Sequence, residues 1–245
     1  MANGFDPRAT VSAQPTTTVG REGVAYDAGL RSYMLSVYNY MASGVLLTGV
    51  VAMLFAQSEV ARQILFGPGL LKYLIMLSPL AFVMVLSFGI NRLSTGAAQA
   101  LFWAFATVMG LSMASIFFVY TNTSIATTFF ATSAAFVSLS LWGYTTKKDL
   151  SGFGTFLIMG VVGLLVAMLL NLWFQSPAMT LAISAIGVLI FAGLTAYDTQ
   201  RIKSMYAYVA GTDMIGKSVI MGALSLYLDF VNMFTFLLQF LGSRD

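Results

Sequence analysis

The chain has 245 residues, of which 58% are hydrophobic and 9% are charged. Soluble domains carry about 25% charged residues, so this composition excludes a soluble protein. The net charge of +3 is typical of loop lysines and arginines that orient a membrane protein, and it does not predict nucleic-acid binding.

The first 28 residues are polar, contain no hydrophobic signal segment, and predict a flexible N-terminal tail. Residues 29–245 predict one membrane domain, because apolar stretches recur that are each about as long as a bilayer requires, roughly 20 residues. We therefore expect an all-α integral membrane protein with seven transmembrane helices, at Tyr33–Ala56, Tyr73–Ile90, Ala98–Tyr120, Ile125–Tyr144, Gly154–Phe174, Met179–Met205 and Ile220–Leu241.

Lysine and arginine predict the orientation, since these residues concentrate on the cytoplasmic side. Three of the 12 lysines and arginines, Arg62, Lys72 and Arg244, fall on the side of the membrane opposite the N-terminus. The other nine share the side of the N-terminus, which predicts a cytoplasmic tail and, with seven spans, a C-terminus on the opposite side. A last span that only dips into the membrane would instead leave both ends in the cytoplasm.

Asp229 is the clearest candidate functional residue. It lies near the middle of the last predicted span, where a charged group is expensive and marks a functional site by default. It belongs to a small and polar stripe at three- and four-residue steps, so we expect the other helices to enclose this span. A purely structural aspartate, hydrogen-bonded to another helix, is the alternative. The stripe comprises Gly222, Ser225, Asp229, Asn232, Phe236 and Gln239.

Asp198 in the sixth span and Arg92 at the end of the second complete the candidate set. An arginine can clamp a carboxylate with paired hydrogen bonds, and two neighbouring carboxylates do not both ionise easily. Each residue has a simpler interpretation. Arg92 would only mark the membrane boundary, and Asp198 would pair with Arg201 or Lys203 at the end of its own helix.

Several enzyme classes are excluded by residue content. The absence of cysteine and histidine excludes cysteine nucleophiles, disulfides and the usual zinc proteases. Neither aspartate has the Gly-x-Gly-Asp context of a diaspartyl membrane protease, and no phosphate-binding or dinucleotide loop is present. We therefore expect neither an enzyme nor a cofactor.

Three segments carry a family resemblance: GLTAYDTQRIK, GALSLYLDFVNMF and LWGYTTKKDLSGFG. Together they resemble the Bax inhibitor-1 family, also called the transmembrane Bax inhibitor motif family, in its bacterial branch. The resemblance runs from about Gly29 to the end and implies six helices around a central, more polar seventh. It also implies a bacterial inner-membrane location.

The function implied by this resemblance is a pH-sensitive calcium leak. Asp198 and Asp229 match the family's proton-sensing pair, which would also contact calcium transiently as the permeant ion, and Arg92 matches the arginine that latches the sixth-helix aspartate. We expect Thr195, Ser225 and Asn232 to line the pathway. A short GSRD ending replaces the charged tail of eukaryotic relatives, so tail-dependent properties are not carried over.

Two other functions remain open at this stage. Some bacterial relatives are linked to the membrane-anchored AAA protease FtsH, so the chain would instead be an interaction protein with the N-terminal tail as its handle. An enzyme or a proton-coupled transporter that uses the same two aspartates is the third hypothesis.

Overall fold

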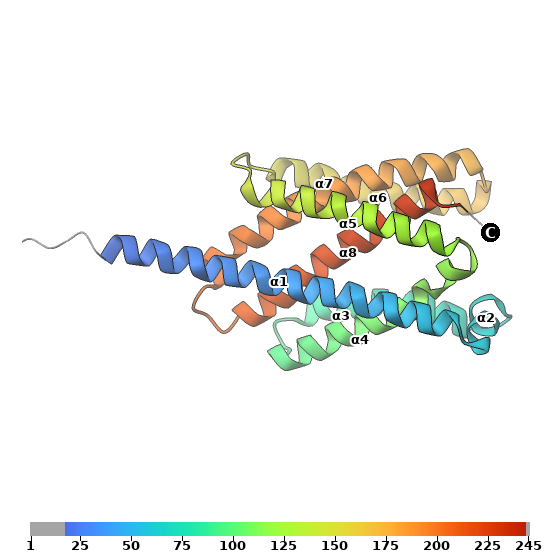
Figure 1. The fold of residues 1–245 in the computed structure, drawn as a ribbon, viewed down its shortest axis with the longest axis horizontal. Helices are drawn as coiled ribbons and strands as arrows, with labels where there is room; N and C mark the ends of the chain where they lie inside the picture. Colours follow the sequence, from blue (N-terminus) through green and yellow to red (C-terminus); the bar gives the residue numbers. More distant parts are fainter. Residues whose placement is uncertain (1–17, 244–245) are drawn as a thin grey trace, which may run out of the picture.

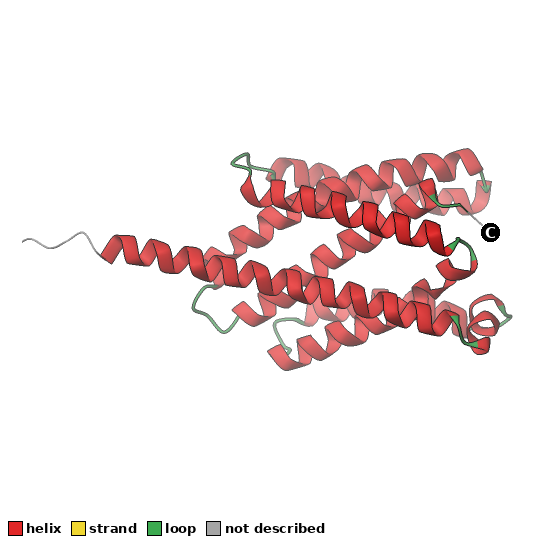
Figure 2. Cartoon of the chain, viewed as in Figure 1, coloured by secondary structure: helices red, strands yellow, loops and turns green. Residues whose placement is uncertain are grey.

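The computed structural model describes residues 18–243, and its regular structure is helical throughout that range (Figures 1 and 2). Seven helices of this range are long and apolar enough to cross a membrane, which confirms the predicted number of spans. The elements are α1 (Thr18–Ala56), α2 (Glu59–Phe66), α3 (Leu71–Gly89), α4 (Thr95–Met113), the 3₁₀ helix η1 (Ala114–Phe118), α5 (Asn122–Thr145), α6 (Ser151–Phe174), α7 (Pro177–Val209) and α8 (Ile215–Leu241).

The first helix begins earlier than the sequence suggests. α1 starts at Thr18, so residues 18–28 of the predicted tail are helical and continue directly into the first span. Their Gly and Thr content favours a tail, but no proline follows to stop a helix that grows backward from an apolar span. The rest of the predicted tail, residues 1–17, lies outside the described residues.

The helices run up and down between two ends of the molecule (Figure 1). The start of α1 and the turns α3–α4, α5–α6 and α7–α8 lie at one end, which we call the proximal end. The C-terminus lies at the other, distal end, where Ser243 bonds to the start of α5 through Ser124 Oγ (2.9 Å) and the Thr121 amide (3.2 Å). α8 therefore runs from the proximal end of the bundle to the distal end (Figure 1).

α8 is the central helix of the bundle. In its most apolar stretch 72% of the residues are buried, against 11–33% in the other six spans. This confirms the prediction that six helices enclose the last one. Burial distinguishes α8 more than polarity does, because its mean hydropathy of 1.6 equals that of α1 and exceeds the 1.5 of α5.

Glycines let the helices around α8 approach closely. A Cβ at Gly187 in α7 would lie 2.6 Å from the Phe236 ring of α8. A Cβ at Gly143 in α5 would collide with the Ala196 carbonyl of α7. Small residues are the usual contact residues between membrane helices, since van der Waals packing replaces the hydrophobic drive there. These contacts fix α7 between α5 and α8 and thereby place Asp198 beside the central helix.

Candidate functional site

Asp229 lies near the midpoint of α8 and is 4% exposed. It is 14 residues past Ile215, or about 21 Å along the helix. Its Oδ2 atom is buried and has no hydrogen-bond partner among the described residues. A buried polar atom without a partner costs about 1–3 kcal/mol, more for a charged group. The structural alternative, a carboxylate held by another helix, leaves this oxygen unexplained.

Asp198 lies in the proximal half of α7, with its side chain 13% exposed. Its Oδ1 atom is 3.9 Å from Arg201 Nη1, one turn further along the same helix. The helix-end pairing that the sequence offers as an alternative is therefore present, although at the outer limit of an ion pair. Lys203, the other candidate, instead donates to the Tyr144 carbonyl oxygen at 2.8 Å and lies over the Tyr144 ring.

Asp198 and Asp229 lie on two helices that pack against each other. α7 packs along α8, and Ser225 of α8 lines the same small cavity as Asp198. Calcium takes six to eight oxygen ligands in proteins. No group of three or more His, Cys, Asp or Glu side chains occurs within residues 18–243, so these carboxylates alone do not form a resident calcium site.

A small cavity of about 100 Å³ opens beside Asp198 at the proximal end. Ser225, one of the predicted pathway residues, lines it one helical turn before Asp229. Tyr33 of α1 also lines the cavity and joins α8 through a hydrogen bond of 2.7 Å to Ser218 Oγ. We call this space the proximal cavity; it joins one predicted aspartate to the proximal end and stops short of the other.

Arg92 is not part of this site. It is exposed in the turn after α3, and its side chain makes no ion pair or hydrogen bond with the described residues. The predicted latch contact with Asp198 is therefore absent, and Arg201 stands in its place. The physical reason is local: an arginine on the same helix, three residues away, faces the carboxylate without any movement of another helix.

Thr195 and Asn232 also lie outside the proximal cavity. The Thr195 hydroxyl is fully buried and donates to the Phe191 carbonyl oxygen at 2.8 Å. The Asn232 amide donates to the Leu228 carbonyl oxygen, also at 2.8 Å. Each side chain is thus satisfied by its own helix, which is a common arrangement for polar residues in membrane helices. Neither residue lines the proximal cavity or the two wider openings described below, contrary to our expectation.

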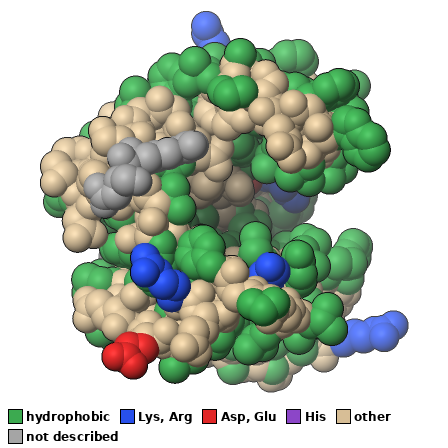
Figure 3. Space-filling view, turned by 90° about the vertical axis from the view of Figure 1, so that its right-hand side faces the viewer, with side chains coloured by type: hydrophobic (Ala, Val, Ile, Leu, Met, Phe, Trp, Pro, Cys, Tyr) green, Lys and Arg blue, Asp and Glu red, His purple; other side chains and the backbone are tan. Residues whose placement is uncertain are grey.

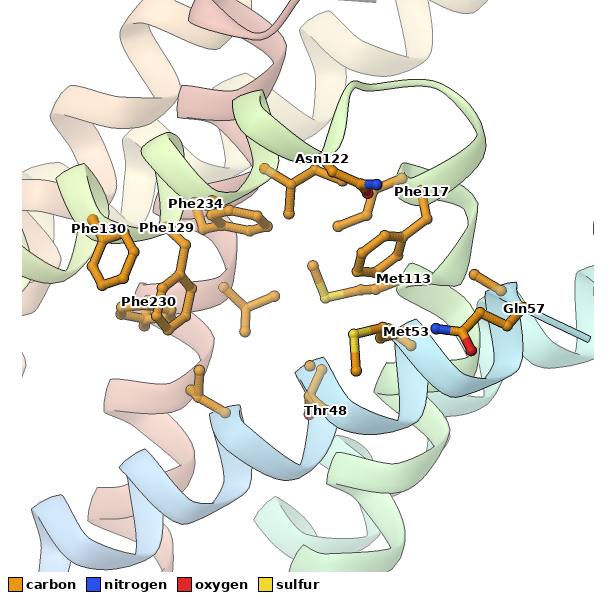
Figure 4. A pocket seen from close by; sticks show the side chains of 18 residues that line it. Thr48, Met53, Gln57, Met113, Phe117, Asn122, Phe129, Phe130, Phe230 and Phe234 are labelled. Atoms are coloured by element: carbon orange, nitrogen blue, oxygen red, sulfur yellow. The ribbon is translucent and has the colours of Figure 1, made fainter. Parts of the chain in front are cut away.

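A wider cleft of about 580 Å³ opens at the distal end, where the molecule is visibly hollowed (Figures 3 and 4). We call it the distal cleft. α1, the end of α4, η1, α5 and α8 line it, with Gln57 and Asn122 among its few polar side chains. Phe230 and Val231 of α8 close its inner end, next to Asp229 in the chain. Sequence reasoning misses this cleft because its lining is apolar and comes from four separate segments.

A second feature missed from the sequence ties α8 to α1. The Tyr227 hydroxyl is 2.6 Å from Thr48 Oγ1, and the Thr48 hydroxyl in turn donates to the Ala106 carbonyl oxygen of α4 at 2.8 Å. All of this is buried, and Tyr227 is 0% exposed. The only sequence signal is a tyrosine inside an apolar span, which when buried requires a partner.

The fold and the site define an integral membrane protein in which six helices surround a seventh that carries a buried, unpartnered aspartate. Comparison with known proteins makes the class more specific. The chain belongs to the Bax inhibitor-1 family, because the family model described as "Inhibitor of apoptosis-promoting Bax1" matches residues 30–245.

Bacterial relatives match over nearly their whole length. The inner membrane protein YbhL of Escherichia coli is 45% identical over 89% of this chain and 94% of its own. An uncharacterized protein of Rickettsia prowazekii is also 45% identical, over 94% of this chain and 97% of its own. An uncharacterized membrane protein of Streptococcus pyogenes is 36% identical over 89% of this chain and 96% of its own.

Proposed function

We propose that this protein is a pH-sensitive calcium leak channel of the bacterial inner membrane, described here in a closed conformation. The observation that carries the proposal is the Asp229 oxygen, buried without a partner at the midpoint of the enclosed helix. A group that destabilises the resting protein is retained when its charge has a use, and intramembrane carboxylates commonly serve ions or protons.

The two openings support a path that is interrupted at Asp229. The proximal cavity reaches Ser225, and the distal cleft ends at Phe230. Between them α8 is tightly packed, with Leu226 and Tyr227 at 0% exposure. The closed segment is therefore about one helical turn long, or roughly 6 Å. A shift of α8 against α7 would join the openings and expose Asp229 to the path.

Protonation of the aspartates is the proposed trigger. Two carboxylates in a medium of low dielectric do not both stay charged, so we propose that Asp198 and Asp229 share a proton. In the closed conformation the ionised member would be Asp198, facing Arg201 at 3.9 Å. A second proton removes the last negative charge from the two carboxylates, so α8 can shift against α7 without moving a charged carboxylate through apolar surroundings. Acid should then increase the leak.

The test is calcium flux into liposomes that contain the purified full chain, measured from neutral to mildly acidic pH. Asp198→Asn and Asp229→Asn should each flatten the pH dependence, because each removes one titrating carboxylate. Asp213→Asn, the same change at an exposed acid between α7 and α8, is the control and should leave the dependence intact. An unchanged titration in Asp229→Asn would refute the pair as the sensor.

Two arginine variants separate the predicted latch from the observed pair. Arg201→Gln should raise the flux at neutral pH, whereas Arg92→Gln should leave it unchanged if Arg92 only marks the membrane boundary. The opposite result would return the latch to Arg92, as the family resemblance implies, in a conformation other than this one.

The interaction hypothesis is the outcome if no flux exceeds that of empty liposomes. The chain would then act by binding a membrane-anchored AAA protease, with residues 1–28 as the handle. Deleting residues 1–17, which precede α1, would abolish control by the protease and leave any ion flux intact.

A further inference from the structure

A second and larger opening lies on the flank of the bundle, between α1 and α5. We call it the α1–α5 groove; it has a volume of about 840 Å³. Its walls are α1 from Arg31 to Leu46 and α5 from Phe129 to Tyr144, and Phe230 of α8 forms its floor at one end. Both walls belong to membrane-spanning helices, so the surroundings of this groove are lipid.

Both serines that line the α1–α5 groove already have hydrogen-bond partners within the protein. The Ser140 hydroxyl is 2.6 Å from the Tyr38 hydroxyl and 2.8 Å from Thr199 Oγ1. The Ser133 hydroxyl donates to the Phe129 carbonyl oxygen at 2.8 Å. The remaining lining is mostly aliphatic and aromatic. A hydrocarbon chain fits such a surface, whereas a polar ligand would lose hydrogen bonds on entering it.

The proximal end of the groove is cationic. Arg31 lies there, and its exposed side chain makes no ion pair or hydrogen bond with the described residues. Tyr144 faces it from α5, and the Lys203 ammonium lies 4.7 Å from the centre of the Tyr144 ring. Two positive charges, those of Arg31 and Lys203, therefore lie at the proximal end of an apolar groove.

The length of the groove matches one leaflet. Fourteen residues separate Arg31 from Val45, where the groove meets Phe129 and Phe230, and this corresponds to about 21 Å of helix. Half of a bilayer's hydrocarbon core is about 15 Å thick. The groove thus holds a whole acyl chain with enough length left for a headgroup beside Arg31.

We propose that the α1–α5 groove binds one anionic phospholipid from the proximal leaflet, with an acyl chain between α1 and α5 and the phosphate at Arg31. Burial of hydrocarbon gives no net drive inside a bilayer, because any lipid is already in hydrocarbon. Selection therefore comes from the shape of the groove and from the charge at its mouth. This site is separate from the aspartate pair and does not depend on the proposed leak.

The experiment is native mass spectrometry of the full chain in mild detergent, titrated with phosphatidylglycerol and, separately, with phosphatidylcholine. The parent should retain one phosphatidylglycerol per chain. Ala42→Trp fills the groove from α1 and should weaken retention at least about tenfold. Ala134→Trp, the same change at an exposed position of α5 outside the groove, should retain the lipid as the parent does.

The charge is tested by Arg31→Gln, which should reduce the preference for phosphatidylglycerol over phosphatidylcholine about fivefold. Lys148→Gln, at the same end but outside the groove, should leave the preference unchanged. Should Ala42→Trp fail to fold, Ser133→Phe fills the groove from its other wall.

Three results would overturn the proposal. One is equal lipid retention by the Ala42 and Ala134 variants, and another is an equal loss of preference in the Arg31 and Lys148 variants. The third is a lipid-free dimer of the parent that Ala42→Trp dissociates, because the groove would then be covered by a second copy of the chain.

Discussion

Replacing Tyr227 by phenylalanine removes a single hydroxyl group from the centre of the bundle, two residues before Asp229. Thr48 has one hydroxyl proton and gives it to the Ala106 carbonyl oxygen, so the Tyr227 hydroxyl is the donor in the 2.6 Å bond between them. Tyr227→Phe therefore deletes one buried hydrogen bond and leaves no donor unpaired. The free energy of unfolding should fall by about 1 kcal/mol.

Replacing the acceptor has a larger effect. Thr48→Val keeps the volume of the side chain but leaves the buried Tyr227 hydroxyl without its partner. The loss should be about 1–3 kcal/mol, since the donor is desolvated and unpaired. In the double variant that donor is gone as well. The combined cost should fall short of the sum of the single costs by about 0.6–1.7 kcal/mol, the range found for hydrogen bonds between membrane helices.

The assay is reversible unfolding of the full chain in mixed micelles, followed by helical circular dichroism as the fraction of denaturing detergent rises. The order of stability should be parent, Tyr227→Phe, Thr48→Val. Additive costs, or a Tyr227→Phe variant less stable than Thr48→Val, would show that this hydrogen bond does not tie α8 to α1 as the distances indicate.

Two further predictions concern packing and pH. Gly143→Ala should lower the free energy of unfolding by about 1–3 kcal/mol, because the new methyl group meets the Ala196 carbonyl. Gly163→Ala is the control and should not destabilise the protein, because the space around Gly163 is open. The same unfolding assay compares the two variants. Hydrogen bonds from Ser151 hold the pKa of Asp149, in the turn before α6, below its usual 3.8. The stabilisation by Asp149 is therefore present above pH 3.8 and is lost as the pH falls through the lowered folded-state pKa. When the free energy of unfolding is measured against pH, Asp149→Asn should remove this acid-dependent loss. The same loss of stability at acidic pH in the variant and the parent would contradict the prediction.

The number and character of the helices were predictable from the sequence. Seven long apolar stretches separated by glycine, proline and charged breaks leave little choice, because backbone polar groups inside a bilayer must bond within a helix. The central position of α8 followed from Asp229, since a carboxylate cannot face lipid. Asp198 joined Asp229 in the candidate set because both are ionisable residues inside predicted spans, and the family resemblance implied their role as a proton-sensing pair.

The start of α1 and the roles of three predicted site residues were not predictable in the same way. Whether Arg92 reaches Asp198 depends on how α3 lies against α7, and Arg201 on the same helix is nearer. Thr195 and Asn232 are polar residues inside predicted spans, yet each bonds to the backbone of its own helix and lies outside the proximal cavity.

The sequence by itself determined that this is a seven-helix membrane protein with an acid at the middle of its last helix, because hydropathy and the cost of a buried charge are local properties of the chain. Only the tertiary structure decided where the openings lie. The distal cleft, the proximal cavity and the α1–α5 groove are each bounded by residues far apart in the chain. Their positions follow from how closely each pair of helices approaches, which is set by the side chains that meet between them.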